Sequence, residues 1–124
     1  MIRGHFNRNG NPCVEIQLSG LRTEVVVDTG FDGASWLPTA FLASLNLELI
    51  STQRFSVADG HTVDSQVFSG KMIWFGKEIE VEIVATESNN ALLGTELLRE
   101  CALFIHFPTK RIEIRKTRKR SARV

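Results

Sequence analysis

The sequence predicts an all-β domain with one or two short helices, and three observations support this fold class. Most apolar residues either alternate with polar ones or form short β-branched runs, which is the pattern of strands. Turn signals that contain glycine separate these runs at short intervals. Helical spacing of apolar residues occurs only after Pro38 and after Gly94. Such a succession of short strands is typical of a β-barrel or a β-sandwich.

The first half of the chain is expected to contain three strands and a helix. CVEIQL alternates, and its apolar residues share one face. The turn Ser19-Gly20 joins it to LRTEVVV, whose run of valines indicates burial on both faces. ASWL is a further short apolar stretch. PTAFLASLNL follows, with apolar residues at helical spacing behind Pro38: Phe41, Leu42 and Leu45.

The second half is expected to contain two hairpins, a helix and two closing strands. RFSVADGHTVDSQV has a hairpin turn at Asp59-Gly60, and SGKMIWFGKEIEVEIVA has one at Gly76-Lys77. The strand EIEVEI alternates strictly, with glutamates outward and apolar residues inward. After the polar loop ESNN, ALLGTELLRE passes through Gly94 into a short helix. ALFIHF and RIEIR flank a turn at Pro108-Thr109-Lys110 and complete the domain.

The composition is that of a single soluble globular domain. The chain has 124 residues, of which 43% are hydrophobic and 23% are charged. No apolar run is long enough to span a membrane, and MIRGHFNRNGNPC lacks the apolar segment of a secretory signal, so we expect a cytoplasmic protein. The two cysteines, Cys13 and Cys101, and the three histidines show no metal-ligand spacing, so no metal or other cofactor is expected.

Charge is unevenly distributed along the chain. Residues 110–124 hold eight basic residues against one acidic residue, a net charge of +7, whereas residues 1–109 hold seven against thirteen, a net charge of −6. We expect one domain at residues 1–115, with its core at 13–114, and a basic disordered tail at 116–124. Weak salt-sensitive contacts of this tail with anionic partners, and its cleavage by a neighbouring molecule, are further interpretations.

An ionisable residue, Asp28, ends the most strand-like segment of the chain, VVVDTG. Burying a carboxylate is costly unless it is paired, hydrogen-bonded or protonated. An aspartate can act as an acid or a base, a threonine hydroxyl can fix a loop, and a glycine lets another chain approach closely. A turn without any chemistry is the alternative interpretation of Asp28-Thr29-Gly30, because these three residue types are common in turns.

The order of the motifs resembles that of the retropepsin-like aspartic proteases, the single-domain relatives of pepsin. An alternating hairpin leads into DTG, a second hairpin stands in the place of the family's flap, and ALLG precedes a short helix. The resemblance is closest to the bacterial members with DTGF-x-G and LLGT-x-LL, and it covers approximately Cys13 to Ile114. It implies a closed β-barrel with a flap hairpin, in which the ALLG strand crosses behind the DTG loop.

The resemblance also implies the chemistry. An aspartic protease places two carboxylates around one water, and because both cannot easily ionise they share a proton; one acts as base and the other as acid. The chain contains one DTG, so the dyad requires a two-fold homodimer in which Asp28 of each subunit meets on the axis. By resemblance, Thr29 hydrogen-bonds across the axis and Gly30 lets the substrate backbone pass.

Five further residues are candidates for contact with a peptide substrate. In related enzymes an acid just beyond the triplet contacts the substrate backbone, which points to Asp32 with the adjacent Gly33; a simple turn is the alternative. Ala58, Asp59 and Gly60 lie at the expected tip of the flap, which has to close over the substrate and reopen.

The chain departs from the viral pattern at the dimer interface. Thr95 stands where the viral members carry an arginine that braces the dimer, so the N-terminal arm and the strand RIEIR become the candidates for the interface. Trp36 belongs either to the core or to a substrate subsite.

Two functions follow from these observations. The first is a homodimeric aspartic endopeptidase, active at acidic to mildly acidic pH on extended peptides with apolar residues flanking the cleaved bond. The second is a non-catalytic dimeric interaction module of the same fold that binds extended peptide segments.

Overall fold

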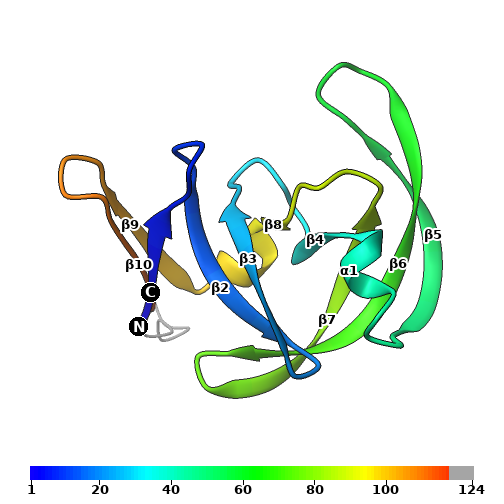
Figure 1. Ribbon diagram of the computed structural model, residues 1–124, viewed down its shortest axis with the longest axis horizontal. Helices are drawn as coiled ribbons and strands as arrows, with labels where there is room; N and C mark the ends of the chain where they lie inside the picture. The colour runs from blue at the N-terminus through cyan, green and yellow to red at the C-terminus, as the bar shows by residue number, and fades with distance from the viewer. Residues whose placement is uncertain (118–124) are drawn as a thin grey trace, which may run out of the picture.

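The computed structural model describes residues 1–117, which form ten strands and two four-residue helices (Figure 1). The predicted all-β class with two short helices is confirmed. The strands are β1 (Ile2–Phe6), β2 (Pro12–Leu18), β3 (Leu21–Val27), β4 (Ser35–Pro38), β5 (Glu48–Ser56), β6 (Thr62–Trp74), β7 (Lys77–Thr86), β8 (Leu92–Leu93), β9 (Cys101–His106) and β10 (Arg111–Lys116). The helices are α1 (Thr39–Leu42) and α2 (Thr95–Leu98), and neither is long enough to cross a membrane.

All ten strands belong to one sheet in the order β5-β6-β7-β4-β8-β3-β2-β1-β10-β9. The pairings β3–β8 and β4–β7 are parallel, and the others are antiparallel. An additional pairing of β2 with β6 means that the hydrogen-bonded neighbours run from β2 through β3, β8, β4, β7 and β6 and return to β2. In Figure 1, the β5–β6 hairpin lies at the right and β1, β10 and β9 lie at the left.

The predicted alternation places the core inside this arrangement of strands. Val14, Ile16 and Leu18 of β2 are all buried, as their shared face requires. The valine run of β3 differs from its prediction, because Val25 and Val27 are buried whereas Val26 is only half-buried. Hence β3 is fully covered on one face and only partly on the other.

The hairpin turns follow the backbone preferences of their residues. Ser19 (φ 48°) and Gly20 (φ 88°) form the predicted turn, with positive φ at both central positions. The turn predicted at Gly76-Lys77 is wrong by one residue. Phe75 (φ 51°) and Gly76 (φ 77°) occupy it, because Trp74 pairs directly with Lys77, which is already the first residue of β7.

The two ends of the described chain pair with each other. β1, which lies in the predicted N-terminal arm, pairs with β10 through Ile2–Ile114 and Gly4–Ile112, while its last two residues pair with β2. β10 extends to Lys116, one residue past the predicted domain boundary, and Thr117 donates from its backbone N and its Oγ1 to the carbonyl oxygen of Glu100, at 2.8 Å each. The rest of the predicted basic tail, residues 118–124, lies outside the described residues.

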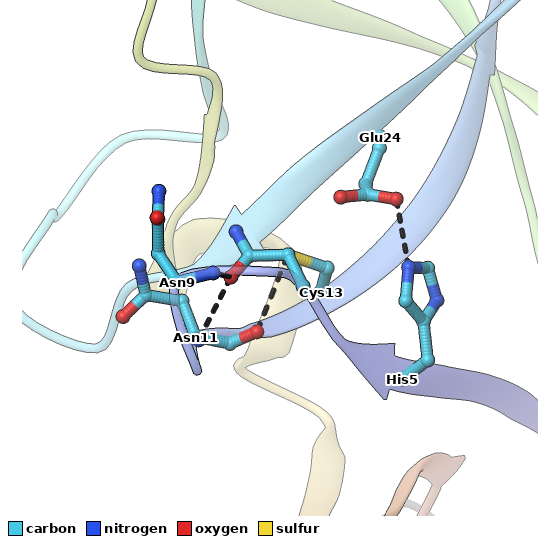
Figure 2. A network of polar contacts seen from close by, with 6 residues as sticks. His5, Asn9, Asn11, Cys13 and Glu24 are labelled. Atoms are coloured by element: carbon cyan, nitrogen blue, oxygen red, sulfur yellow. Dashed lines mark hydrogen bonds and ion pairs between the residues drawn. The ribbon is translucent and has the colours of Figure 1, made fainter.

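A polar network joins β1, the following turn and the β2–β3 hairpin (Figure 2). His5 Nε2 lies 2.7 Å from Glu24 Oε2, and Asn7 Oδ1 accepts hydrogen bonds from the backbone N of Asn9 and Asn11. The Cys13 thiol donates to the carbonyl oxygen of Asn11 at 3.4 Å. Burial, and to a lesser extent the nearby Glu24 carboxylate, raises the pKa of this thiol to about 11. Cys13 is therefore a packing residue rather than a nucleophile.

Candidate active site

Asp28 lies where β3 ends, and β8 holds it there. β8 pairs in parallel with the end of β3, matching Val26 with Leu92 and Val27 with Leu93. The backbone N of Asp28 donates to the carbonyl oxygen of Leu93 at 2.9 Å. The ALLG segment thus lies directly beside the strand that carries Asp28.

The loop after β3 folds back on the Asp28 side chain. Asp28 Oδ1 accepts a hydrogen bond from the backbone N of Gly30 at 2.8 Å, and the backbone N of Phe31 donates to the Asp28 carbonyl oxygen at 3.2 Å. The carboxylate is half-buried, and Thr29 and Gly30 are exposed. One carboxylate oxygen is therefore fixed by its own loop while the group stays open to a ligand.

The start of α2 anchors the same loop from behind. The backbone N of Thr95 donates to the Phe31 carbonyl oxygen at 2.8 Å, and the backbone N of Gly94 donates to that of Ala34 at 3.0 Å. A Cβ atom at Gly94 would lie 2.6 Å from both the Phe31 carbonyl oxygen and its ring, and would collide with the Gly33 carbonyl oxygen. Only glycine allows this close approach.

A cavity of about 1120 Å³ opens beside Asp28. The DTG loop, β4, the β5–β6 hairpin and the segment from the end of β7 to β8 line it. Its aromatic wall is Phe31 and Trp36, whose rings meet edge-on at 5.7 Å, and Trp36 packs in the same way on Phe55 of β5 at 5.9 Å. Trp36 is half-buried and lines the cavity. A smaller cavity of about 410 Å³ near Trp74 lies apart from Asp28.

The structure brings only some of the predicted site residues together. Asp28 and Gly30 share the cavity with Ala58 of the hairpin tip. The other predicted residues are not among its lining residues: Thr29, Asp32, Gly33, Asp59 and Gly60. Asp32 is exposed, and Gly33 packs beside the Phe31 ring.

The hairpin tip is organised by Asp59. Its Oδ1 accepts a hydrogen bond from the backbone N of His61 and its Oδ2 lies near His61 Nδ1, both at 2.9 Å. The backbone hydrogen bond from His61 is the largest of the effects that hold the pKa of Asp59 below its ordinary value, followed by the His61 side chain. Gly60 adopts a φ of 88°, which glycine accepts without strain. In this chain Asp59 and Gly60 shape the tip, and Ala58 faces the cavity.

The polar wall of the cavity contains residues that no motif in the sequence marks. This wall contains Thr39 of α1 and three residues of the loop ahead of β8: Glu87, Ser88 and Asn90. A signal for it was present, because ESNN directly precedes ALLG and must lie close to the segment that flanks Asp28.

Comparisons with known proteins identify the fold. No family model matches the sequence, and no curated protein matches it. The structure is similar to a retropepsin-like aspartic protease from Rickettsia conorii, with TM-score 0.67, 17% identity and coverage of 94% of this chain and 90% of that one. It is also similar to the EIAV protease complexed with the inhibitor HBY-793 (TM-score 0.61, 19% identity, coverage 76% and 90%). The protease of Simian Foamy Virus (mac) gives TM-score 0.54, 21% identity and coverage of 70% and 91%. The chain therefore has a retropepsin-like fold.

Proposed function

We propose that this protein is a homodimeric aspartic endopeptidase whose catalytic dyad is Asp28 from each of two subunits. The observation that carries the proposal is the position of Asp28. It ends a strand of a retropepsin-like fold, has ALLG beside it, and faces a cavity large enough for a peptide segment.

The reaction needs no group beyond the two carboxylates and a water. The ionised Asp28 takes a proton from the water while the water oxygen attacks the peptide carbonyl carbon. The protonated Asp28 of the other subunit gives its proton to the carbonyl oxygen. The resulting tetrahedral diol collapses when the peptide nitrogen takes a proton from one carboxyl and the C–N bond breaks. A diol hydroxyl returns its proton to the dyad, so the dyad ends in its starting state.

The β5–β6 hairpin acts as the flap in this proposal. Ala58 faces the cavity, and Asp59 and Gly60 give the tip a defined shape that can move as a unit. Asp32 and Gly33 do not line the cavity of the single chain, and we propose that they contact substrate backbone that extends past it. Thr29, exposed beside Asp28, is proposed to hydrogen-bond to the partner across the two-fold axis.

We place the dimer contact on β9. The predicted interface strand RIEIR is β10, which is already paired on both sides, with β1 and with β9. Within residues 1–117, β9 has a neighbour on one side only, and its other edge is free to pair with a second chain. Phe104 of β9 is 42% exposed and Phe107 just after it is 66% exposed, which gives this edge apolar surface to bury.

A comparison of the wild type with Asp28→Asn tests the proposal. Asparagine keeps an oxygen that can accept the Gly30 hydrogen bond but cannot act as acid or base, so the variant should remain a dimer. Cleavage of a denatured protein at about pH 4–6, with and without a pepstatin-type inhibitor, is measured alongside sedimentation. Cleavage by a wild-type dimer and none by an Asp28→Asn dimer supports the endopeptidase. A wild-type dimer that is inert throughout supports the interaction module.

A further inference from the structure

We propose that Glu87 is a specificity-determining residue that binds a lysine or arginine side chain of the peptide in the cleft beside Asp28. The inference rests on the proposed function and names a substrate class for it. Glu87 lies in the loop between β7 and β8 and lines the same cavity as Asp28.

The first argument is the charge of the cavity. Three carboxylates line it, and its lining residues include no lysine, arginine or histidine. Asp64 already forms an ion pair with Arg54, which does not line the cavity: Arg54 Nε lies 2.9 Å from Asp64 Oδ1. Asp28 is the catalytic residue of the proposed function. Among residues 1–117, Glu87 forms no ion pair with a basic side chain, so it is the carboxylate left to attract a cation.

The second argument is that Glu87 is held in place without being neutralised. The Thr39 hydroxyl lies 3.2 Å from Glu87 Oε1 and 3.1 Å from the Thr86 carbonyl oxygen, so its one hydrogen serves either acceptor. The loop is braced from within, because Ser88 Oγ lies 3.0 Å from Thr86 Oγ1 and accepts a hydrogen bond from the backbone N of Asn90. A braced loop loses less conformational freedom when a ligand binds.

The third argument is the chemistry of a long basic side chain. Its charged end can form a charge-assisted hydrogen bond with Glu87, and arginine can do so with two parallel bonds. Its methylene stem needs apolar surface, which Trp36 and Ala85 provide in the same cavity. A peptide lying in the cleft also excludes water from the exposed carboxylate, which strengthens the attraction.

Matched peptides test the inference. A fluorogenic peptide that the wild type cleaves is varied one position at a time among lysine, arginine, norleucine and glutamate. We expect one position at which lysine or arginine raises kcat/KM about tenfold over norleucine. In Glu87→Gln the ratio of kcat/KM for the basic peptide to that for the norleucine peptide should fall to about one. Glu87→Lys should prefer the glutamate peptide at the same position. Glu82→Gln removes one exposed carboxylate of β7 and is the control, which should keep the wild-type ratio.

The outcomes separate this inference from the proposed function. Cleavage without a basic preference at any position, or a preference that survives in Glu87→Gln, overturns the role of Glu87 and leaves the endopeptidase intact. If no parent peptide that the wild type cleaves can be found, binding of lysine and norleucine peptides to the Asp28→Asn protein is compared by fluorescence anisotropy. If the lysine peptide binds more tightly than the norleucine peptide, and Glu87→Gln abolishes the difference, Glu87 forms the basic subsite although the protein is not an enzyme. Equal binding of the two peptides rejects the subsite.

Discussion

The hydroxyl of Thr95 donates a hydrogen bond to the carbonyl oxygen of Phe31 at 3.2 Å, beside the 2.8 Å bond from the Thr95 backbone N. The resemblance to the viral proteases predicted that an arginine brace is missing at this position, and the side chain found here braces the DTG loop of its own chain. The loop that presents Asp28 is therefore held from inside one chain.

Thr95→Val should loosen this loop while leaving the fold intact. Valine keeps the shape of threonine and removes the hydroxyl, so the free energy of unfolding should fall by about 0.5–1.5 kcal/mol. Under the proposed function kcat should fall more than KM changes, because Asp28 loses its fixed position. Urea unfolding and peptide cleavage measure the two effects. Thr95→Ser, which keeps the hydroxyl, should retain most of the stability and most of kcat. An equal loss of stability and kcat in Thr95→Val and Thr95→Ser would contradict this account.

Gly94→Ala and Gly30→Ala should separate folding from chemistry. At Gly94 the added methyl group overlaps Phe31 and Gly33, and such overpacking should cost on the order of 3 kcal/mol. At Gly30 the methyl group meets only Asp28 Oδ1, at 3.2 Å, so stability should change little while cleavage falls. Thermal unfolding and cleavage of both variants check the contrast; a Gly30→Ala protein with full activity would speak against Asp28 as the catalytic residue.

Glu113 should make stability depend on pH in the acidic range. Arg115 Nη2 lies 2.6 Å from Glu113 Oε1 and Arg111 Nε lies 3.2 Å from Oε2, and the side chain is 8% exposed. The hydrogen bond from Arg115 is the main cause that holds the pKa of Glu113 below its ordinary value of 4.5. A lowered folded-state pKa stabilises the protein above pH 4.5, and this contribution is lost as the pH falls through the lowered value.

Glu113→Gln should therefore be less stable than the wild type at neutral pH, with a difference that shrinks as the pH drops below 4.5. Urea unfolding at about pH 7 and about pH 3.5 measures the difference. Glu80→Gln, which changes an exposed outward glutamate of β7, is the control. A difference that stays constant with pH would show that the carboxylate is not the source.

Neither thiol should react readily in the folded protein. Burial raises the pKa of Cys13 to about 11 and also raises that of Cys101, so little thiolate is present at neutral pH. A thiol reagent that yields a coloured product should react slowly with the native protein and with two thiols per chain after unfolding. Rapid native reaction of one equivalent would contradict the burial of that residue.

Phe104→Asp should weaken the proposed dimer. The Phe104 ring packs against His106 at 6.3 Å and under the Arg111 guanidinium at 5.0 Å, on the strand with the free edge. A carboxylate there should shift sedimentation toward the monomer and lower cleavage at low protein concentration, with recovery at high concentration. Leu49→Asp is the matched control, because Leu49 is 51% exposed on β5, away from β9. A Phe104→Asp dimer of wild-type affinity would remove β9 from the interface.

Local patterns in the sequence predict β2 and β7 from their strict alternation, and β3 from its β-branched run and the glycine turn before it. β1 was missed because IRGHF holds only two large apolar residues, and its stability as a strand comes from β10, more than a hundred residues away. The turn at Phe75 was displaced for a related reason, since its register is fixed by the pairing of Trp74 with Lys77.

The candidate site follows the same division. DTG and ALLG were recognised as motifs, and the parallel pairing of β3 with β8 brings them together as expected. Glu87 and Thr39 were not expected, because they meet only once α1 and the end of β7 are placed side by side. Asp59 stays a predicted contact for the substrate, and the hydrogen bond that its carboxylate accepts from the backbone N of His61 could not be read from the motif.

The pairing of Ile2 with Ile114 determines when the β1–β10 part of the sheet can form during synthesis. β1 is translated more than a hundred residues before its main partner β10. Contacts between residues so far apart in sequence form late and slow folding. A nascent chain therefore cannot complete the sheet that carries β9 until β10 has been translated. The proposed pairing of two chains at β9 would accordingly be delayed until that point of synthesis.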